Sequence, residues 1–383
     1  MNNRLLHTPE GVRDIYGKEY ARKLAVEQKL QKAIHCFGYE DIQTPSIEFF
    51  DVFSREIGTT PSKELYKFFD KEGNTLVLRP DFTPSIARCA AKYFMEEKVP
   101  LRFSYNGNTF TNTSNLQGKL KEVTQMGAEL IGDPSVEADA EVISMVIEAL
   151  KSAGLTRFQV TIGEVDYFLG LCEEAGLDED TEQELRSCIS GKNFFAAQEL
   201  LEQKQIPEPY HGILLKLADM FENIESLEDA KELVKNERSL QAIARLEKLK
   251  ERLAQYGVAE YISFDLGMLS KYQYYTGVVF KAYTYGIGDA VVKGGRYDNL
   301  LGKFGKNAAA IGFVIVIDDL LEALSRQKVR IDIPASGKVV CYRAGDEADY
   351  LAKLSEVVSL RKEGIPTVLS PEITENEEAD SNE

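Results

Sequence analysis

Alternating apolar and polar positions between residues 107 and 132 predict two antiparallel strands joined by a loop near Gly118. On the returning strand, Gln125 and Glu129 share one face and have apolar neighbours. A sheet face of this kind can form the floor of a pocket for a small polar ligand. The same pattern also fits an ordinary half-exposed hairpin, so the pattern alone leaves both interpretations open.

Helical spacing of apolar residues predicts two long helices, over residues 18–37 and 135–153. The second helix has the clearer signals, because Ser135 is a good N-cap and Gly154 follows its last residue. The apolar positions of the first helix are Tyr20, Leu24, Leu30, Ile34 and Phe37. Between residues 166 and 257 strand signals are absent and charged helical blocks follow one another, which predicts a helical insertion between two strands of one sheet.

The segment between the two long helices predicts a strand pair followed by a further helix. Residues 64–70 and 75–79 form the strands, and Thr83, followed by proline, is placed as the N-cap of the helix. Asp81, just before that helix, either accepts from a ligand ammonium group or lies in a solvated turn. Pro45 cannot donate to a β-ladder, so it belongs to an edge strand or to a loop.

Strand signals continue at residues 157–165, 261–268 and 276–284. Gly294 and Gly295 then follow a further short apolar strand. Because glycine has no side chain, this pair either lets the backbone approach a ligand closely or forms a β-bulge.

The C-terminal part predicts a small separate unit. A linker over residues 326–337 precedes a strand (338–342), a helix (346–362) and a second strand (367–369). The last residues are rich in acidic side chains, contain no basic ones and are expected to be disordered. The resulting domain plan is a core over residues 1–325, a short α/β unit over 326–370 and an acidic tail over 371–383.

Composition narrows the classes of function. The chain has 383 residues and a net charge of −17, which disfavours nucleic acid as a partner. No apolar run approaches the length of a membrane span, and the five scattered cysteines fit a reduced, cytoplasmic protein. The three histidines stand apart from other metal-ligand residues, and phosphate-binding glycine motifs are missing, so neither a metal nor a cofactor is expected.

Several short segments occur in a fixed order over residues 5–325. They are GVRDI (11–15), a first motif with Pro45, LRPDFT (78–83), the 107–132 hairpin, Asp139-Ala140-Glu141-Val142 and GGRYD (294–298). Each segment is weak alone, but the ordered set is specific, and the chain resembles the catalytic core of the histidyl-tRNA synthetase family. The resemblance implies an α+β fold of the class II aminoacyl-tRNA synthetase type. In that fold an antiparallel sheet is flanked by helices, here with a helical insertion and a short C-terminal α/β unit.

The resemblance also implies that the synthetase chemistry is lost. Its second-motif arginine and glutamate, which bind ATP, correspond to Thr111 and Thr113. Its catalytic arginine corresponds to Ser270, with Lys271 beside it as a weak substitute, and its third-motif arginine corresponds to Asp319. Hydroxyl and carboxylate groups cannot stabilise phosphoryl charge as arginine does, so no aminoacylation is expected and no catalytic residue is assigned.

The residues that recognise the amino acid are retained by the same comparison. The resemblance assigns the ligand's amino group to Asp81 and Thr83, and the floor of the pocket to Gln125 and Glu129. It assigns the side of the pocket that holds the imidazole ring to Tyr274 and Tyr275.

Retained binding with lost chemistry resembles the ATP phosphoribosyltransferase regulatory subunits, which are paralogues of the synthetase. This resemblance implies a short-form catalytic subunit as partner in a hetero-oligomer, expected to be an octamer. It also implies self-association through the synthetase-like dimer interface, feedback inhibition by L-histidine, and no nucleic-acid or membrane partner. Two alternatives stay open. One is a divergent histidyl-tRNA synthetase, and the other is a stand-alone histidine-sensing or tRNA-sensing module.

Overall fold

The structure of the protein, a computed structural model, describes residues 4–53, 60–113, 120–218, 226–269, 274–333 and 337–372. The chain divides into two compact units, Met1–Ile331 and Asp332–Glu383. Within the described ranges, no helix combines the length and the apolar character needed to cross a membrane.

The first unit is built on a large sheet with the strand order β1-β5-β6-β11-β10-β9-β7-β8. Neighbouring strands are antiparallel, except that β1 is parallel to β5 and β8 is parallel to β7. The strands are β1 (Glu40–Asp41), β5 (Leu101–Phe110), β6 (Glu122–Ile131), β7 (Phe158–Glu164), β8 (Ile262–Phe264), β9 (Val278–Thr284), β10 (Val292–Arg296) and β11 (Ala310–Val316). The predicted 107–132 hairpin is therefore confirmed as the pair β5 and β6, and its turn residue Gly118 lies outside the described residues.

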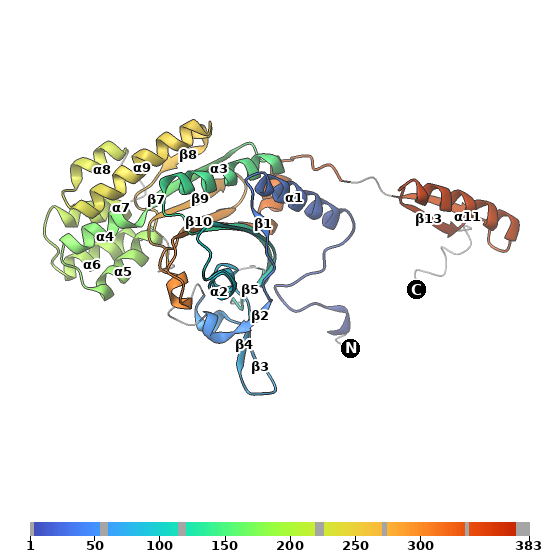
Figure 1. The fold of residues 1–383 in the computed structure, drawn as a ribbon, viewed down its shortest axis with the longest axis horizontal. Helices are drawn as coiled ribbons and strands as arrows, with labels where there is room; N and C mark the ends of the chain where they lie inside the picture. Colours follow the sequence, from blue (N-terminus) through green and yellow to red (C-terminus); the bar gives the residue numbers. More distant parts are fainter. Residues whose placement is uncertain are drawn as a thin grey trace. The chain divides into compact units, whose positions relative to one another are not determined.

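The two faces of this sheet are covered by different helices (Figure 1). On one face lie α1 (Gly17–His35), α3 (Val136–Ala153) and α10 (Ile317–Arg326). Even-numbered residues of β6, such as Met126 and Leu130, point to this side and are buried there. On the other face lies α2 (Thr83–Tyr93), whose Ile86 packs in one cluster with Tyr105 of β5. The odd-numbered face, which carries Glu129, is thus the face beneath α2.

Beside α2, β2 (Ile47–Phe49), β4 (Thr75–Leu78) and β3 (Lys67–Phe69) form a small antiparallel sheet in that order. Pro45 lies between β1 and β2, so it is a loop proline, and its carbonyl faces the side chain of Arg79.

Between β7 and β8 the chain forms the helices of the insertion, α4 (Val165–Glu174), α5 (Glu179–Ser190), α6 (Phe194–Gln203), α7 (Tyr210–Ala218), α8 (Leu227–Leu233) and α9 (Glu237–Gln255). The α+β class and the helical insertion are confirmed. The cap predictions for α3 also hold, because the Ser135 side chain accepts the N–H of Ala138 and Gly154 has a φ of 100°.

The second unit contains β12 (Lys338–Tyr342), α11 (Glu347–Lys362) and β13 (Thr367–Pro371), and its two strands are parallel. This strand–helix–strand order agrees with the sequence. Val340 and Val357 are buried between the strands and the helix. From residue 373 onward the predicted acidic tail lies outside the described residues.

The structure corrects two local predictions. Thr83 is not an N-cap but the first residue of α2, and its hydroxyl turns to the sheet instead. Gly294 and Gly295 form no bulge, because β10 pairs regularly on both sides and the space above them holds the rings of Phe280 and Tyr275.

The first predicted helix is confirmed as α1. Of its apolar positions, Leu30 and Ile34 face the core together with Val26, whereas Tyr20 and Leu24 are exposed at 47% and 38%.

Candidate functional site

The floor of the candidate site is a patch of the central sheet in which glycines make room for functional side chains. Gly295 of β10 lies opposite Gly312 of β11, and Gly312 lies opposite Glu129 of β6. A Cβ on Gly312 would overlap the carboxylate of Glu129, and one on Gly127 would overlap the ring of Tyr105. The absence of side chains at these positions lets larger groups from neighbouring strands lie flat over the sheet.

Glu129 is the centre of this floor. It is 1% exposed and accepts two hydrogen bonds, from the hydroxyl of Thr83 at 2.7 Å and from that of Tyr297 at 2.5 Å. Burial raises the pKa of Glu129 to about 8, and the nearby charge of Asp81 adds to the effect, while the two hydroxyls oppose it. Glu129 is therefore mostly protonated at pH 7 and can donate or accept a proton at the base of a cavity.

Above this floor is a cavity of about 140 Å³. Its lining includes Asp81, Thr83, Gln125, Tyr274 and Tyr275, together with Tyr297 and Lys293. The predicted pocket residues Asp81, Thr83, Gln125, Tyr274 and Tyr275 therefore come together, and Glu129 lies beneath Thr83, to which it is hydrogen-bonded. The Oε1 atom of Gln125 is buried and has no hydrogen-bond partner among the described residues, which suits a site that awaits a polar ligand.

Asp81 is placed by the turn that leads into α2. Its carboxylate accepts the backbone N–H of Thr83 at 3.3 Å. Just upstream, Arg79 donates to the carbonyls of Thr44 and Asn108 and stacks on the ring of Phe82. These contacts tie the start of α2 to the strands on either side, so Asp81 is held at the edge of the cavity rather than in a solvated turn.

The two tyrosines form an aromatic wall. The rings of Tyr274 and Tyr275 lie 4.5 Å apart, and Tyr274 meets Tyr297 edge to face at 6.1 Å. Tyr275 covers Gly295, where a Cβ would lie 2.6 Å from its ring. A flat, polar-edged ligand could stack against this wall while its ring atoms reach the hydroxyls and Glu129.

Of the positions assigned to lost synthetase chemistry, Thr111, Thr113 and Asp319 are not among the residues that line this cavity. Thr111 and Thr113 follow β5, and the Thr113 hydroxyl is buried with no partner among the described residues. Asp319 lies in the first turn of α10, and burial raises its pKa. Ser270 and Lys271 lie outside the described residues.

A buried ion cluster fixes the strand that carries the pocket tyrosine. Asp139 of α3 is fully buried and pairs with Arg296 of β10 and Arg245 of α9, each at 2.5 Å. Arg296 also donates to the carbonyls of Asp133 and Ser135. Asp139 and Arg296 belong to two separate segments of the family resemblance. In the structure they form one ion pair that joins β10 to α3, and Arg245 extends the cluster to α9.

The sequence missed Tyr297 and Lys293 as pocket residues. Residues alternate between the two faces of a strand, so Lys293, Gly295 and Tyr297 had to share one face. That signal was present, but only the register between β10, β11 and β6 shows which face lies above Glu129.

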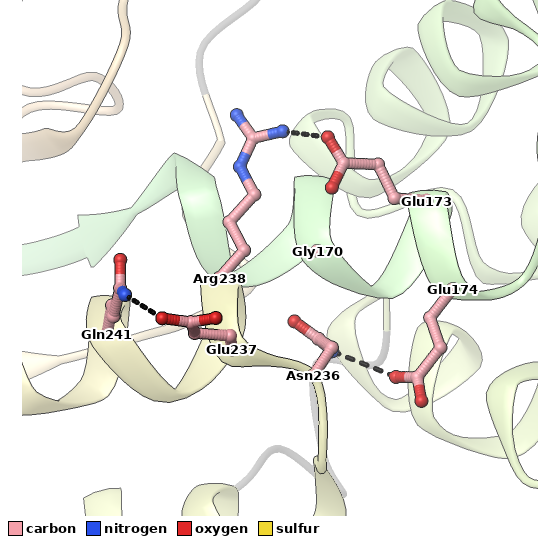
Figure 2. A pocket seen from close by; sticks show the side chains of 7 residues that line it. All are labelled: Gly170, Glu173, Glu174, Asn236, Glu237, Arg238 and Gln241. Carbon is pink, nitrogen blue, oxygen red and sulfur yellow. Dashed lines mark hydrogen bonds and ion pairs between the residues drawn. The ribbon is translucent and has the colours of Figure 1, made fainter.

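A second hollow, of about 540 Å³, lies on the helical insertion between α4 and α9 (Figure 2). It is lined by Gly170, Glu173, Glu174, Asn236, Glu237, Arg238 and Gln241. The polar side chains are paired with one another: Arg238 with Glu173, Asn236 with Glu174, and Gln241 with Glu237. This hollow is therefore a hydrogen-bonded seam between two helices, and the pocket above Glu129 remains the candidate site.

Comparison with known proteins agrees with this architecture. The histidyl-tRNA synthetase family model matches residues 11–320. An ATP phosphoribosyltransferase regulatory subunit from Acetivibrio thermocellus is 41% identical over 94% of this chain and 85% of its own length. One from Clostridium kluyveri is 36% identical over 95% and 93%.

Among solved structures, an ATP phosphoribosyltransferase regulatory subunit/histidyl-tRNA synthetase from Bacillus halodurans C superimposes with a TM-score of 0.85. It is 32% identical, and the match covers 99% of this chain and 96% of the other. The chain belongs to the histidyl-tRNA synthetase family and, within it, groups with the ATP phosphoribosyltransferase regulatory subunits.

Proposed function

We propose that the protein is the non-catalytic regulatory subunit of ATP phosphoribosyltransferase and that it binds L-histidine in the pocket above Glu129. In this role it assembles with a short catalytic subunit, which it activates, and it transmits feedback inhibition by histidine at the first step of histidine biosynthesis. The names of its relatives support the partner enzyme, and the pocket supports the ligand.

The observation that carries the ligand assignment is the buried carboxyl of Glu129 between the hydroxyls of Thr83 and Tyr297. An imidazole ring has one nitrogen that donates and one that accepts, so it complements a carboxyl and a hydroxyl. Asp81 at the cavity edge suits the ligand's ammonium group. Regulation then follows by linkage, because a ligand that binds one state of the assembly better shifts the assembly toward that state.

The lack of chemistry is supported by the side chains at the positions of the synthetase arginines. Thr111 cannot make a charged contact to a phosphate, and Asp319 carries the wrong sign. Loss of one such electrostatic contact already costs about 3 kcal/mol of barrier in enzymes that depend on it. The proposal therefore predicts no ATP–pyrophosphate exchange with histidine.

The test is calorimetry with L-histidine, on the purified protein alone and after mixing with a short-form catalytic subunit. We expect saturable binding of one histidine per chain and a complex of both chains on gel filtration, with catalytic activity that depends on this subunit. Histidine-dependent ATP–pyrophosphate exchange would instead identify a synthetase. Histidine binding without any complex would identify a stand-alone sensor.

A further inference from the structure

The cavity has one described residue with a positive charge in its lining, Lys293. Lys293 lies on β10, on the same face of the sheet as Gly295 and Tyr297. It is two residues from Gly295, which is in register with Glu129 through Gly312. Its side chain is 38% exposed while it also lines the cavity, so Lys293 lies where the cavity meets solvent.

The sheet geometry places Lys293 at the right distance for a free amino acid. Lys293 lies opposite Val314, which lies opposite Gly127, so two strand spacings separate β10 from β6. That separation is about 10 Å, and the shift to the row of Glu129 adds about 7 Å along the strand. A ligand whose ring rests on Glu129 and whose backbone atoms point toward β10 would bring its carboxylate within reach of the Lys293 side chain.

The charges of an amino acid require such a partner. A zwitterion brings a carboxylate as well as an ammonium group, and burying a carboxylate without a partner is strongly unfavourable. Asp81, the other charged lining residue, suits the ammonium group and repels the carboxylate. Gln125 can add a neutral hydrogen bond but no charge.

Lys293 already forms an ion pair, with Asp289, and this pair can be exchanged for another. Its Nζ lies 2.7 Å from Oδ2 of Asp289, which is 64% exposed. Lys293 also acts on the charge of Asp319 at the start of α10. Exposed ion pairs of this kind contribute about 0 to 1 kcal/mol, so exchange of one carboxylate partner for another costs little.

We infer that Lys293 binds the carboxylate of the amino-acid ligand, and that this contact makes the pocket selective for a free amino acid over derivatives that lack the carboxylate. This inference rests on the proposed histidine site and names the group that would complete it. In the complex, Lys293 exchanges or shares its contact with Asp289.

The test compares L-histidine with L-histidinamide by calorimetry. The amide keeps the ring and the ammonium group but lacks the carboxylate. We expect the wild-type protein to prefer histidine by about tenfold, which corresponds to about 1.4 kcal/mol, and Lys293→Met to bring the ratio close to one while its affinity for the amide stays within about twofold. Retained amide binding also shows that the variant is folded.

Two further variants sharpen the test. Lys281→Met removes the lysine opposite Lys293 on β9, which does not line the cavity, and should keep the preference. Asp289→Asn frees Lys293 and should tighten histidine binding by about threefold, within the range of an exposed pair.

Two results would overturn the inference, and a third would overturn the proposed function on which it rests. Full preference for histidine in Lys293→Met would show that another group binds the carboxylate. An equal loss of this preference in Lys281→Met would show that the effect comes from the positive charge near the site and not from a contact of Lys293. Failure of the wild-type protein to bind either compound would instead overturn the proposed histidine site itself.

Discussion

The raised pKa of Glu129 predicts an unusual pH profile for histidine binding. Glu129 holds its proton up to about pH 8, whereas a free imidazole ring loses its proton near 6.5. Between these two values the empty pocket carries one proton and the free ring carries none. A complex in which Glu129 and the ring share one proton then forms without net proton exchange, so affinity is constant across this window.

Outside the window the proton count changes. Below pH 6.5 the free ring and Glu129 hold two protons together, and one must leave on binding. Above pH 8 neither holds one, and the complex must take one up. Each mismatch weakens binding by about tenfold per pH unit, so the affinity should be flat near neutral pH and fall on both sides.

The variant Glu129→Gln tests the predicted fall in histidine affinity above pH 8. Glutamine cannot ionise, yet it keeps an oxygen that can accept from Thr83 or Tyr297 and an amide that can donate to the ring. The ligand's ionisable groups are the same in both experiments, so the ratio of the two affinities reports the effect of replacing Glu129. Calorimetry from pH 5.5 to 9.5 should give a constant ratio below pH 8 and about a tenfold change in it per pH unit above. A ratio that stays constant to pH 9.5 would refute the assignment of the ring to Glu129.

Three other changes test parts of the structure that support the site. Gly312→Ala should abolish histidine binding, because the new Cβ overlaps the carboxylate of Glu129, whereas Gly288→Ala meets no neighbouring atom and should bind normally by calorimetry. Asp139→Ala should lower the free energy of unfolding by about 3 kcal/mol in urea, since it leaves buried guanidinium groups without their partner. Glu164, buried with a pKa raised to about 8 mainly by desolvation, should make wild-type stability fall by roughly 1 kcal/mol per pH unit between pH 4.5 and 8, because the folded state keeps a proton that the unfolded chain has lost. In Glu164→Gln this contribution should be absent and that of Glu129, whose pKa is also about 8, should remain, so between pH 5 and 8 the variant should lose less stability than the wild type. An equal loss in the two proteins would contradict the assignment.

The sequence predicted the elements whose signals are local. The helix from Val136 to Ala153 carries its own cap at Ser135 and its own stop at Gly154, and both act as expected. The β5–β6 hairpin was equally clear from alternation. Such features depend on neighbours within a few residues, so no knowledge of the fold is needed to find them.

The misjudged residues are those whose partners lie far along the chain. Thr83 followed by proline has every local mark of an N-cap, but its hydroxyl donates to Glu129, 46 residues away. The structure instead makes Thr83 the first residue of α2, and its hydroxyl turns to this buried carboxyl on β6. Likewise, Lys293 and Tyr297 join the pocket only through the pairing of β10 with β11 and of β11 with β6.

The burial of Glu129 is itself an argument for a ligand. A carboxyl held at a pKa of about 8 lowers the stability of the fold at neutral pH relative to a side chain that cannot ionise. Packing does not require the charge, since glutamine has the same shape and could meet the same hydroxyls. If the position were only structural, Glu129→Gln would gain stability and lose nothing. We expect it to unfold at higher urea concentration than the wild-type protein at pH 8 and also to lose the alkaline change in histidine affinity. A gain in stability together with an unchanged pH profile of binding would show that Glu129 serves the fold and not the ligand.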